Sequence, residues 1–370
     1  ALVFCGLYFD TSESKGWFKK GLKILMKELS EQILPDGGHF ERSPMYHCLV
    51  LEDLIDILNL LESASFEIET STALREKRIL KKKISQMMRW LQVMTFEDGE
   101  ISFFNDAALN IAPNYRQLKA YSEKFGIRDS SESPKRLSHL EDSGYIRIQV
   151  SDLVIILDVA PLGPDYLPGH GHADTFTFEM SINGKRAVVN SGTSCYGISE
   201  ERIKERSTIS HNTASIEDWN SSEIWSGFRV GERAKVVELE IYEENDEIIV
   251  LAIHDGYTKM YRDAFHKRKW RIRANQVSVS DQISNLNNKW LKSRIHFHPD
   301  WEMVNGGDLK LSHNENGQQI VCESNSSNCE IEDSLYHPEF GLSLINTCFA
   351  LTTKENKLEY SLKWNLSDTE

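Results

Sequence analysis

The sequence predicts an α+β multidomain protein, in which N-terminal helical hairpins are followed by an antiparallel β-sandwich. Two observations support this prediction. Apolar residues recur every three or four positions in the first part of the chain, as in amphipathic helices, and alternate with polar residues after about residue 130, as in strands. The chain of 370 residues is also long enough for two or three domains with a large core.

Three segments are expected to form consecutive helices. Residues 16–34 and 72–94 carry apolar side chains at spacings of three and four. Residues 47–63 are apolar over most of the helix circumference, which predicts a well-buried helix. Consecutive helices with short connections favour antiparallel helical hairpins. Residues 1–7 are mostly apolar and are expected to be the middle of a buried element, so that the chain is a fragment without its N-terminal part.

The expected domain boundary is a polar, proline-containing segment without apolar periodicity. This linker, residues 128–137, separates the end of a helical domain, residues 1–127, from a β-sandwich domain, residues 138–370. Many short strands with Gly, Asn and Asp turns are typical of a sandwich. Strands are expected at residues 145–150, 153–159, 234–241, 247–253, 267–274, 276–284, 293–298, 319–322, 341–351 and 360–364.

Composition excludes several classes of partner. The formal net charge is -14, whereas nucleic acids and anionic membrane surfaces attract basic proteins. An acidic polysaccharide stays compatible with this charge if a local basic cleft binds it. No apolar run reaches the ~18–20 residues that span a bilayer, so no membrane insertion is expected. The six cysteines are scattered, which leaves both free thiols and a bridge between Cys322 and Cys329 open.

The segment from residue 169 to His211 organises the chain. His170 and His172 are two residues apart, which on extended backbone places both imidazoles on the same side. A strand follows, and the Asn-Gly pair at 183–184 predicts a hairpin that returns the chain to Asn190. His211 is a candidate third imidazole. Two histidines and an oxygen ligand on a rigid sheet suit zinc or a similar divalent ion, although most His-x-His pairs bind no metal.

A second informative segment is the loop at residues 36–47, which connects the first two helices. Two glycines at 37–38 provide a tight turn, and Ser-Pro at 43–44 is a typical helix start. Tyr46 and His47 therefore fall in the first turn of the second helix. Titratable residues are unusually dense here, and loops mounted on rigid helices often carry active sites. A purely structural, hydrogen-bonded loop is the alternative.

Several runs of sequence accompany these two segments. They are Gly169-His170-Gly171-His172-Ala173-Asp174, Asn190-Ser191-Gly192-Thr193, Tyr196, and Arg206 through His211-Asn212-Thr213. Together they closely resemble the heparinase II/III-like family of polysaccharide lyases. The resemblance implies that the helices are the last hairpins of an incomplete α/α toroid. It also implies a lyase that cleaves a uronic-acid-containing acidic polysaccharide, similar to a glycosaminoglycan or alginate, by β-elimination. A periplasmic or secreted location is implied, with a cytoplasmic one left open.

The resemblance also assigns roles to individual residues. Tyr46 would act as general acid or base, His170 as base or neutraliser of the uronate carboxylate, and Tyr196 as a second phenol in the cleft. Elimination removes the weakly acidic C5 proton and expels O4, so it needs a base, an acid and stabilisation of the enolate. Arg206 would either hold the His211 loop or contact substrate. The expected substrate-binding residues are His39, Glu41, Arg42, His47, Asn105 and Arg206.

The family's metal positions fall on His172, Asn190 and His211. The metal, expected to be Zn²⁺, would be structural and would fix the loop that carries His170. The family usually has an aspartate where this chain has Asn190, and an amide oxygen is a weaker ligand than a carboxylate. The family's carboxylate-neutralising residue has no counterpart in residues 1–35 and is expected upstream of Ala1, so this fragment alone would lack it.

Two other functions are compatible with the sequence. A non-catalytic carbohydrate-binding relative, serving surface-polysaccharide assembly, is favoured by Asn190. A metal-dependent hydrolase would need a carboxylate base beside the metal, and Asp174 is the near candidate. Outside these segments, the second His-x-His pair, His296 and His298, is expected to consist of packing or turn residues. Arg268 is expected on a solvated face of its strand.

Overall fold

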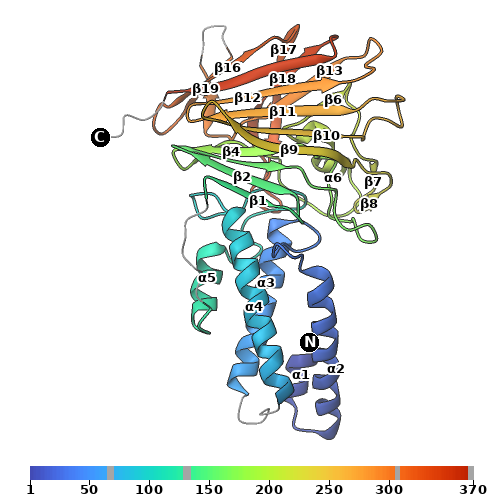
Figure 1. Ribbon diagram of the computed structural model, residues 1–370, viewed down its shortest axis with the longest axis vertical. Helices are drawn as coiled ribbons and strands as arrows, with labels where there is room; N and C mark the ends of the chain where they lie inside the picture. The colour runs from blue at the N-terminus through green and yellow to red at the C-terminus, as the bar shows by residue number, and fades with distance from the viewer. Residues whose placement is uncertain (65–70, 128–134, 305–308, 366–370) are drawn as a thin grey trace.

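A computed structural model of the protein describes residues 1–64, 71–127, 135–304 and 309–365. Long helices extend away from a stacked group of β-sheets, so that the helical and sheet parts meet end to end (Figure 1). The predicted order, helices first and antiparallel sheets after them, is confirmed. Within these described ranges no helix has the length and apolar character needed to cross a membrane. The helices are α1 (Leu2–Tyr8), α2 (Ser12–Gln32), α3 (Pro44–Ser63), α4 (Ser71–Val93), α5 (Tyr115–Glu123) and α6 (Glu200–Arg206), and a 3₁₀ turn, η1 (Thr208–Ser210), follows α6.

The helix starts are set by capping residues rather than by the apolar pattern. Thr11 and Ser14 form a capping box before α2, in which each side-chain oxygen accepts a hydrogen bond from the other residue's backbone N–H. Ser43 caps α3 by accepting from the Tyr46 N–H, and Pro44 occupies the first helical position. Both helices therefore begin three or four residues before the periodic stretch that predicted them. Helix α5, capped by Asn114, was not predicted because it is short.

Five strands form one sheet in sequential order, and the predicted hairpin lies within it. Asn183 and Gly184 connect the last two strands with φ values of 52° and 70°, as a two-residue hairpin turn requires. All neighbouring strands of the sheet are antiparallel. The strands are β1 (Leu137–Leu140), β2 (Tyr145–Val150), β3 (Leu153–Asp158), β4 (Phe178–Ile182) and β5 (Lys185–Val188).

An eight-stranded and a four-stranded antiparallel sheet complete the stack, with a short hairpin beside them. The eight-stranded sheet has the order β14 (Trp301–Met303), β15 (Lys310–His313), β16 (Gln319–Ser324), β19 (Lys357–Trp364), β12 (Gln276–Ile283), β11 (His266–Arg273), β10 (Glu247–His254) and β9 (Val236–Glu244). The four-stranded sheet has the order β17 (Asn328–Tyr336), β18 (Leu344–Thr353), β13 (Leu291–His296) and β6 (Ala214–Ile216). The hairpin consists of β7 (Ile224–Trp225) and β8 (Arg229–Val230). Strand β17 was not predicted, because it is an edge strand whose exposed positions carry mostly acidic and polar side chains.

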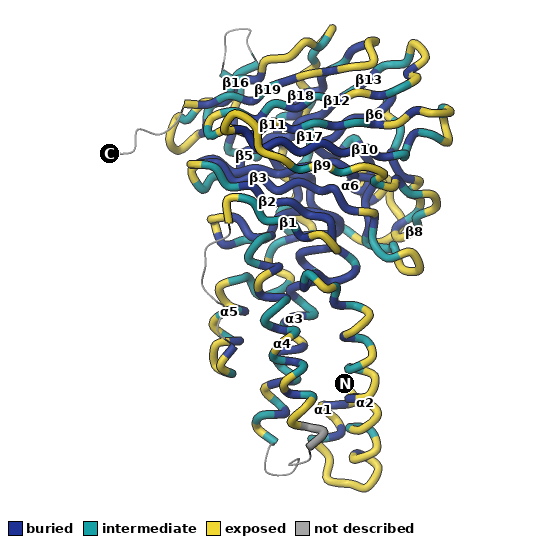
Figure 2. Tube along the Cα trace, viewed as in Figure 1, coloured by how far each residue is buried: buried dark blue, intermediate teal, exposed yellow. Residues whose placement is uncertain are grey.

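The sheets share one hydrophobic core, which includes Ile155, Phe178, Trp270 and Phe349 from the three large sheets. Figure 2 shows the buried residues concentrated in the stacked strands and on the inner faces of the helices. A second cluster fills the helical part, and Tyr336 at the end of β17 belongs to it. The junction between the helical and sheet parts is therefore packed, which holds loops from both parts in fixed positions.

The prediction that Arg268 lies on a solvated face is wrong. Strand β11 alternates in burial, and Arg268 occupies the same inner face as Trp270. It donates two hydrogen bonds to Asp281 at 2.6 and 2.7 Å and one each to the carbonyls of Phe176 and Asn212. Burial alone would raise the pKa of Asp281, but the attraction and hydrogen bonds of Arg268 hold it well below its usual range. A strand pattern does not reveal a charge that is buried with its partner.

Several smaller expectations have clear outcomes. Helix α1 buries Val3 and Gly6 but exposes Leu2 and Phe4, so residues 1–7 are only partly a buried element. The cysteines are all free thiols, which excludes the bridge between Cys322 and Cys329 in this structure. His296 is buried and hydrogen-bonded to Ser334, as expected for a packing residue. Most of the predicted linker, residues 128–134, lies outside the described residues.

The buried ion pair predicts a large effect on stability. Asp281→Ala should lower the free energy of unfolding by about 3–5 kcal/mol, because Arg268 would stay buried without its charged partner. Urea denaturation followed by tryptophan fluorescence would measure the change. The control Glu323→Ala removes an exposed ion pair with Lys363 and should cost no more than about 1 kcal/mol. Equal costs for both variants would contradict a structural role for the Arg268–Asp281 pair.

Candidate active site

The three predicted catalytic residues lie together at the junction of helices and sheets. The Tyr46 hydroxyl, in the first turn of α3, is 2.8 Å from the Tyr196 hydroxyl. The ring of His170 lies against that of Tyr46, with a centroid separation of 4.1 Å, and its centroid is 6.1 Å from that of Tyr196. Tyr196 is 37% exposed and the His170 side chain 21% exposed, so solvent and ligands can reach the group.

The two phenols of this group are protonated at neutral pH. Burial raises the pKa of Tyr46, and burial together with the nearby Asp106 charge raises that of Tyr196 well above its usual range. A protonated phenol can donate a proton or a hydrogen bond but is a poor base. In this arrangement Tyr46 is therefore suited to act as a general acid.

Asp106 fixes the orientation of His170. Its carboxylate is fully buried and lies 2.8 Å from His170 Nδ1 and 2.8 Å from His172 Nε2, while Arg202 donates two further hydrogen bonds to it. Burial alone would raise the pKa of Asp106, but these hydrogen bonds hold it well below its usual range. An ionised carboxylate only accepts, so both histidine nitrogens that face it carry the proton.

The tautomer of His170 follows from this contact. With the proton on Nδ1, the Nε2 lone pair of His170 is free to accept a proton from a ligand. His170 Nε2 is 4.0 Å from the carboxylate of Glu41, a residue of the 36–47 loop. Burial raises the pKa of Glu41. The group therefore combines an oriented base, a protonated phenol and a carboxyl group within a few ångströms.

His172 and His211 are arranged as a pair of metal ligands. His172 Nε2 donates to Asp106, which leaves the lone pair on Nδ1. His211 Nδ1 faces the amide oxygen of Asn190 at 3.1 Å, because the Asn190 amide nitrogen is used by the Phe103 carbonyl. The remaining His211 nitrogen, Nε2, lies 3.3 Å from His172 Nδ1. Two lone pairs at this distance repel one another unless a positive charge lies beside them.

Asp174 supplies the third ligand of this set. One ligand atom from each of His172, Asp174 and His211 lies within 4.8 Å of the others, and all three residues are buried. Asp174 Oδ2 is buried without a hydrogen-bond partner among the described residues. Two tetrahedral zinc ligands at ~2.0–2.1 Å from the ion would be roughly 3.3 Å apart, which matches the spacing of the two nitrogens. The residues present therefore fit a divalent ion.

Asn190, the third residue of the predicted set, also contacts His211. Its amide oxygen lies 3.1 Å from His211 Nδ1 and accepts a hydrogen bond from Thr177 at 2.6 Å. In this arrangement Asn190 orients His211, as hydrogen-bond partners of metal-bound histidines usually do. The geometry thus offers Asp174 as a ligand beside the predicted set of His172, Asn190 and His211.

Comparison with known proteins identifies the family of this chain. A family model described as "Heparinase II/III-like, C-terminal" matches residues 132–364, and one described as "Heparinase II/III N-terminus" matches residues 1–131.

The chain belongs to the heparinase II/III-like family.

Curated relatives of this heparinase II/III-like chain are bacterial. A heparin-sulfate lyase of Bacteroides stercoris is 27% identical over 239 residues, which cover 59% of this chain and 34% of that protein. A heparin-sulfate lyase of Pedobacter heparinus is 25% identical over 242 residues and is covered to 35%. The alignments thus span about a third of the relatives' length.

Solved structures share the fold of this chain over its full length. The structure of a heparinase III superposes with a TM-score of 0.78 at 19% identity, covering 100% of this chain and 59% of that chain. A heparan sulfate lyase from Pedobacter heparinus gives a TM-score of 0.75 at 17% identity, with 59% of that chain covered. The predicted fold class is thereby confirmed over the length of this chain.

Three of the predicted substrate contacts of this heparinase II/III-like chain are buried and hold loops in place. Asn105 accepts from the His172 N–H at 3.2 Å and donates to the Arg42 carbonyl. Arg206 donates to the Gly171 carbonyl at 3.0 and 3.2 Å, so it holds the His170–His172 loop rather than facing the cleft. Arg42 donates to the carbonyl of Pro161 at 2.8 Å.

Two predicted substrate contacts, His39 and His47, are buried histidines of the 36–47 loop itself. The ring of His47 stacks on Trp90, accepts from the His39 N–H and lies 3.0 Å from the Met87 carbonyl. Burial lowers the pKa of His47 to about 3 and that of His39 to about 4, so both rings are neutral at pH 7. These buried contacts hold the conformation of the loop. Glu41 is the member of the predicted set that lies beside His170.

Two residues that build the site were not assigned roles from the sequence. Asp106 follows Asn105, for which substrate binding was predicted, but its own role was not predicted. Arg202 lies in a short, highly charged helix, which is the pattern of a solvated surface, yet its side chain is fully buried against Asp106. Phe228 flanks the group, with ring centroids 5.9 Å from His170 and 5.2 Å from Tyr196. No local sequence pattern marks these contacts, because they join segments far apart in the chain; Asp106 and Arg202 are 96 residues apart.

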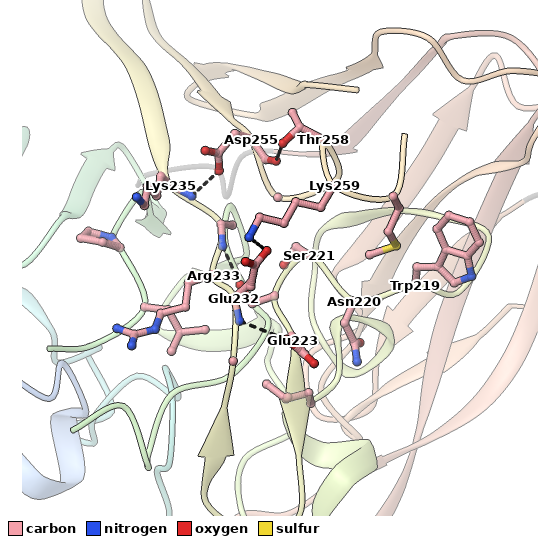
Figure 3. A pocket seen from close by; sticks show the side chains of 18 of the residues that line it. Trp219, Asn220, Ser221, Glu223, Glu232, Arg233, Lys235, Asp255, Thr258 and Lys259 are labelled. Atoms are coloured by element: carbon pink, nitrogen blue, oxygen red, sulfur yellow. Dashed lines mark hydrogen bonds and ion pairs between the residues drawn. The ribbon is translucent and has the colours of Figure 1, made fainter. Parts of the chain in front are cut away.

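A separate pocket of about 850 Å³ lies beside β7 and β8 (Figure 3). It is lined largely by polar and charged side chains, with Trp219 at one side and an ion pair between Glu232 and Lys259. Neither Tyr46 nor His170 lines it, so the candidate active site is separate from this pocket.

Buried neutral histidines predict a pH-dependent stability. The folded protein leaves His47 unprotonated down to about pH 3, whereas the unfolded chain binds a proton below about pH 6.5. The wild type should therefore lose stability from this group as the pH falls through that window. The difference in unfolding free energy between the wild type and His47→Gln should shrink by roughly 1 kcal/mol per pH unit below pH 6. Urea denaturation at pH 7, 6 and 5 measures it, and a constant difference would contradict the assignment.

Proposed function

We propose that the protein is a polysaccharide lyase that cleaves a uronic-acid-containing acidic polysaccharide by β-elimination. The observation that carries this proposal is the grouping of Tyr46, His170 and Tyr196, with His170 oriented by Asp106. The relatives named heparin-sulfate lyases make a glycosaminoglycan of the heparan sulfate type the first substrate to test. This chain spans 59% of the length of the solved heparinase III structure, so further parts of the site are expected outside it.

The geometry supports separate roles for the histidine and the phenol. In the tautomer with its proton on Nδ1 facing Asp106, His170 has a free Nε2 lone pair that can take the C5 proton of the uronate. Tyr46, whose pKa is raised by burial, keeps its proton and can deliver it to the leaving O4. Tyr196, 2.8 Å away, can return a proton to Tyr46 or hold its hydroxyl in position. Tyr46 thereby acts as the acid and His170 as the base.

The proposed metal is a single structural Zn²⁺ held by His172, Asp174 and His211. A divalent ion there would supply positive charge for two imidazole lone pairs and a buried carboxylate. His172 shares the Asp106 carboxylate with His170, so holding His172 also holds the base. The ion has no part in proton transfer in this proposal.

The non-catalytic alternative loses its main support. It depended on Asn190 as a weak ligand in the metal site. In the metal set proposed here a carboxylate, Asp174, is the third ligand, and Asn190 would orient His211 through its Nδ1. The catalytic proposal is therefore the better supported of the two.

Removing one hydroxyl tests the role of Tyr46. Tyr46→Phe in the full-length protein should lower turnover by about 10²–10⁴-fold, because the proposed proton donor to O4 is lost. Formation of unsaturated product is followed by its near-ultraviolet absorbance on heparan sulfate and other uronate polymers. The matched control Tyr242→Phe changes an exposed residue of β9 and should keep full activity. Substrate binding by the wild type without any product would instead support the carbohydrate-binding alternative.

Two substitutions separate the metal assignments. Asp174→Asn should remove one bound divalent ion per chain, measured by elemental analysis after dialysis against zinc. Asn190→Ala should keep that ion at saturation but bind it about 10–100-fold more weakly, because it loses only the hydrogen bond that orients His211. The reverse result, with the ion lost from Asn190→Ala and kept in Asp174→Asn, would make Asn190 the ligand.

A further inference from the structure

A second group of metal-binding side chains lies on the other face of α6. Glu201 and Glu205 are one helical turn apart, so they lie on the same face of the helix, whereas Arg202 and Arg206 point to Asp106 and the Gly171 carbonyl. His337, which follows β17, packs beside the two glutamates. One ligand atom from each of Glu201, Glu205 and His337 lies within 4.8 Å of the others.

The carboxylate of Glu205 is buried, and only one of its two oxygens is hydrogen-bonded. The residue is 2% exposed, and its Oε1 accepts hydrogen bonds from the backbone and the hydroxyl of Ser194. Its Oε2 is buried without a hydrogen-bond partner among the described residues. Leaving a buried carboxylate oxygen unpaired is costly. A hollow of about 180 Å³ is lined by this glutamate together with Glu201 and His337.

The ring of His337 presents a lone pair to Glu205. Its Nδ1 is 3.0 Å from the Ser343 hydroxyl and 3.4 Å from the Leu342 carbonyl, which only accepts, so Nδ1 carries the proton. Its Nε2 is 3.6 Å from Glu205 Oε1, too far for a hydrogen bond. Two acceptors therefore face the same space, as His172 and His211 do in the first site. A cation bound between them would make both favourable.

Lys204 is the nearest alternative source of that charge. It lines the same hollow, but it is exposed, and its ammonium group makes no hydrogen bond or ion pair with the described residues. Its flexible side chain can turn into solvent when another cation enters. The hollow is open to solvent on the side of Glu201, which gives an ion a path to the buried ligands.

We propose that Glu201, Glu205 and His337 bind a divalent transition-metal ion at a site separate from His172, Asp174 and His211. One imidazole and two carboxylates suit Zn²⁺ or Mn²⁺. Two ligands four residues apart on one helix are a common way of holding such an ion. The ion would neutralise the two carboxylates and give the unpaired Glu205 oxygen a partner.

The ion would connect α6 to the segment that carries Tyr196. His337 donates its backbone N–H to the Ser191 carbonyl at 2.7 Å, and Gly192 pairs with His337 so closely that a Cβ there would lie 2.3 Å from the His337 carbonyl. Ser194, held by Glu205, is two residues before Tyr196. A bound ion would therefore stabilise the backbone that positions Tyr196 without touching substrate.

Metal binding by variants tests the proposal without any activity assay. The wild type, Glu205→Gln and Glu13→Gln are titrated with Zn²⁺ and, separately, with Mn²⁺, with bound metal counted after equilibrium dialysis. Glu205→Gln should bind one ion fewer than the wild type and keep its fold, because glutamine can still accept from Ser194. Glu13→Gln, the matched control in the exposed first turn of α2, should bind as the wild type does.

Further variants keep the test decisive. Asp174→Asn should retain the ion that Glu205→Gln loses, which separates this site from the one in the proposed function. Glu201→Gln, at an exposed position that cannot unfold the core, should weaken binding by about 100-fold, and Lys204→Gln should bind at least as tightly as the wild type. The proposal is overturned if Glu205→Gln and Glu201→Gln bind as many ions as the wild type. It is equally overturned if Asp174→Asn binds none.

Discussion

The Asp106 carboxylate accepts hydrogen bonds from His170, His172 and Arg202 in a fully buried position, and the candidate active site depends on this contact. A buried charge is tolerated only when donors surround it. Here the donors come from the His170–His172 loop and from α6, so burying one carboxylate brings two separate segments together. The same contact sets the proton of His170 on Nδ1 and that of His172 on Nε2. The contact with Asp106 therefore both orients His170, the proposed base, and leaves the Nδ1 lone pair of His172 free to bind a metal ion.

The same principle recurs in other parts of the molecule. Asn190 sets the tautomer of His211, and the Ser343–Leu342 segment sets that of His337, so that a lone pair faces a carboxylate or a second imidazole in each case. Deep in the sheets, Asp281 accepts from His266 and Arg268, and Arg268 also binds the carbonyl of Asn212, beside His211. Neutral histidines with one fixed proton are what a site for a divalent ion requires. The polar network thus extends from the sheet core to the junction with the helices.

Sequence patterns predicted the elements well where one face is apolar and the other polar. The three long helices and most strands follow from that periodicity, and Tyr46, His170 and Tyr196 come from recognisable motifs that the structure brings together. The roles of Asp106, Arg202 and Arg268 could not be predicted. A charged residue is expected on the surface unless its oppositely charged partner, here distant in sequence, is known. The sequence likewise did not show that Asp174 lies beside His172 and His211, or that the Asn190 amide faces His211 Nδ1. Spacing gives the residues near an ion but not which side of an imidazole each one occupies.

Tyr46 belongs to α3 of the helical part, whereas His170 and Tyr196 belong to loops of the sheet part, and the hydroxyl contact of 2.8 Å crosses the junction. The proposed acid and the proposed base thus lie on separate halves of the polypeptide. If one half were exchanged for that of a relative, both parts would still fold. The Tyr46 hydroxyl would then shift relative to His170 by as much as the packing at the junction differs between the two proteins. The two halves are therefore expected to diverge together, with compensating changes on both sides of the junction and freedom elsewhere. Chimeras cut between residues 127 and 138 would reveal how closely that packing must match.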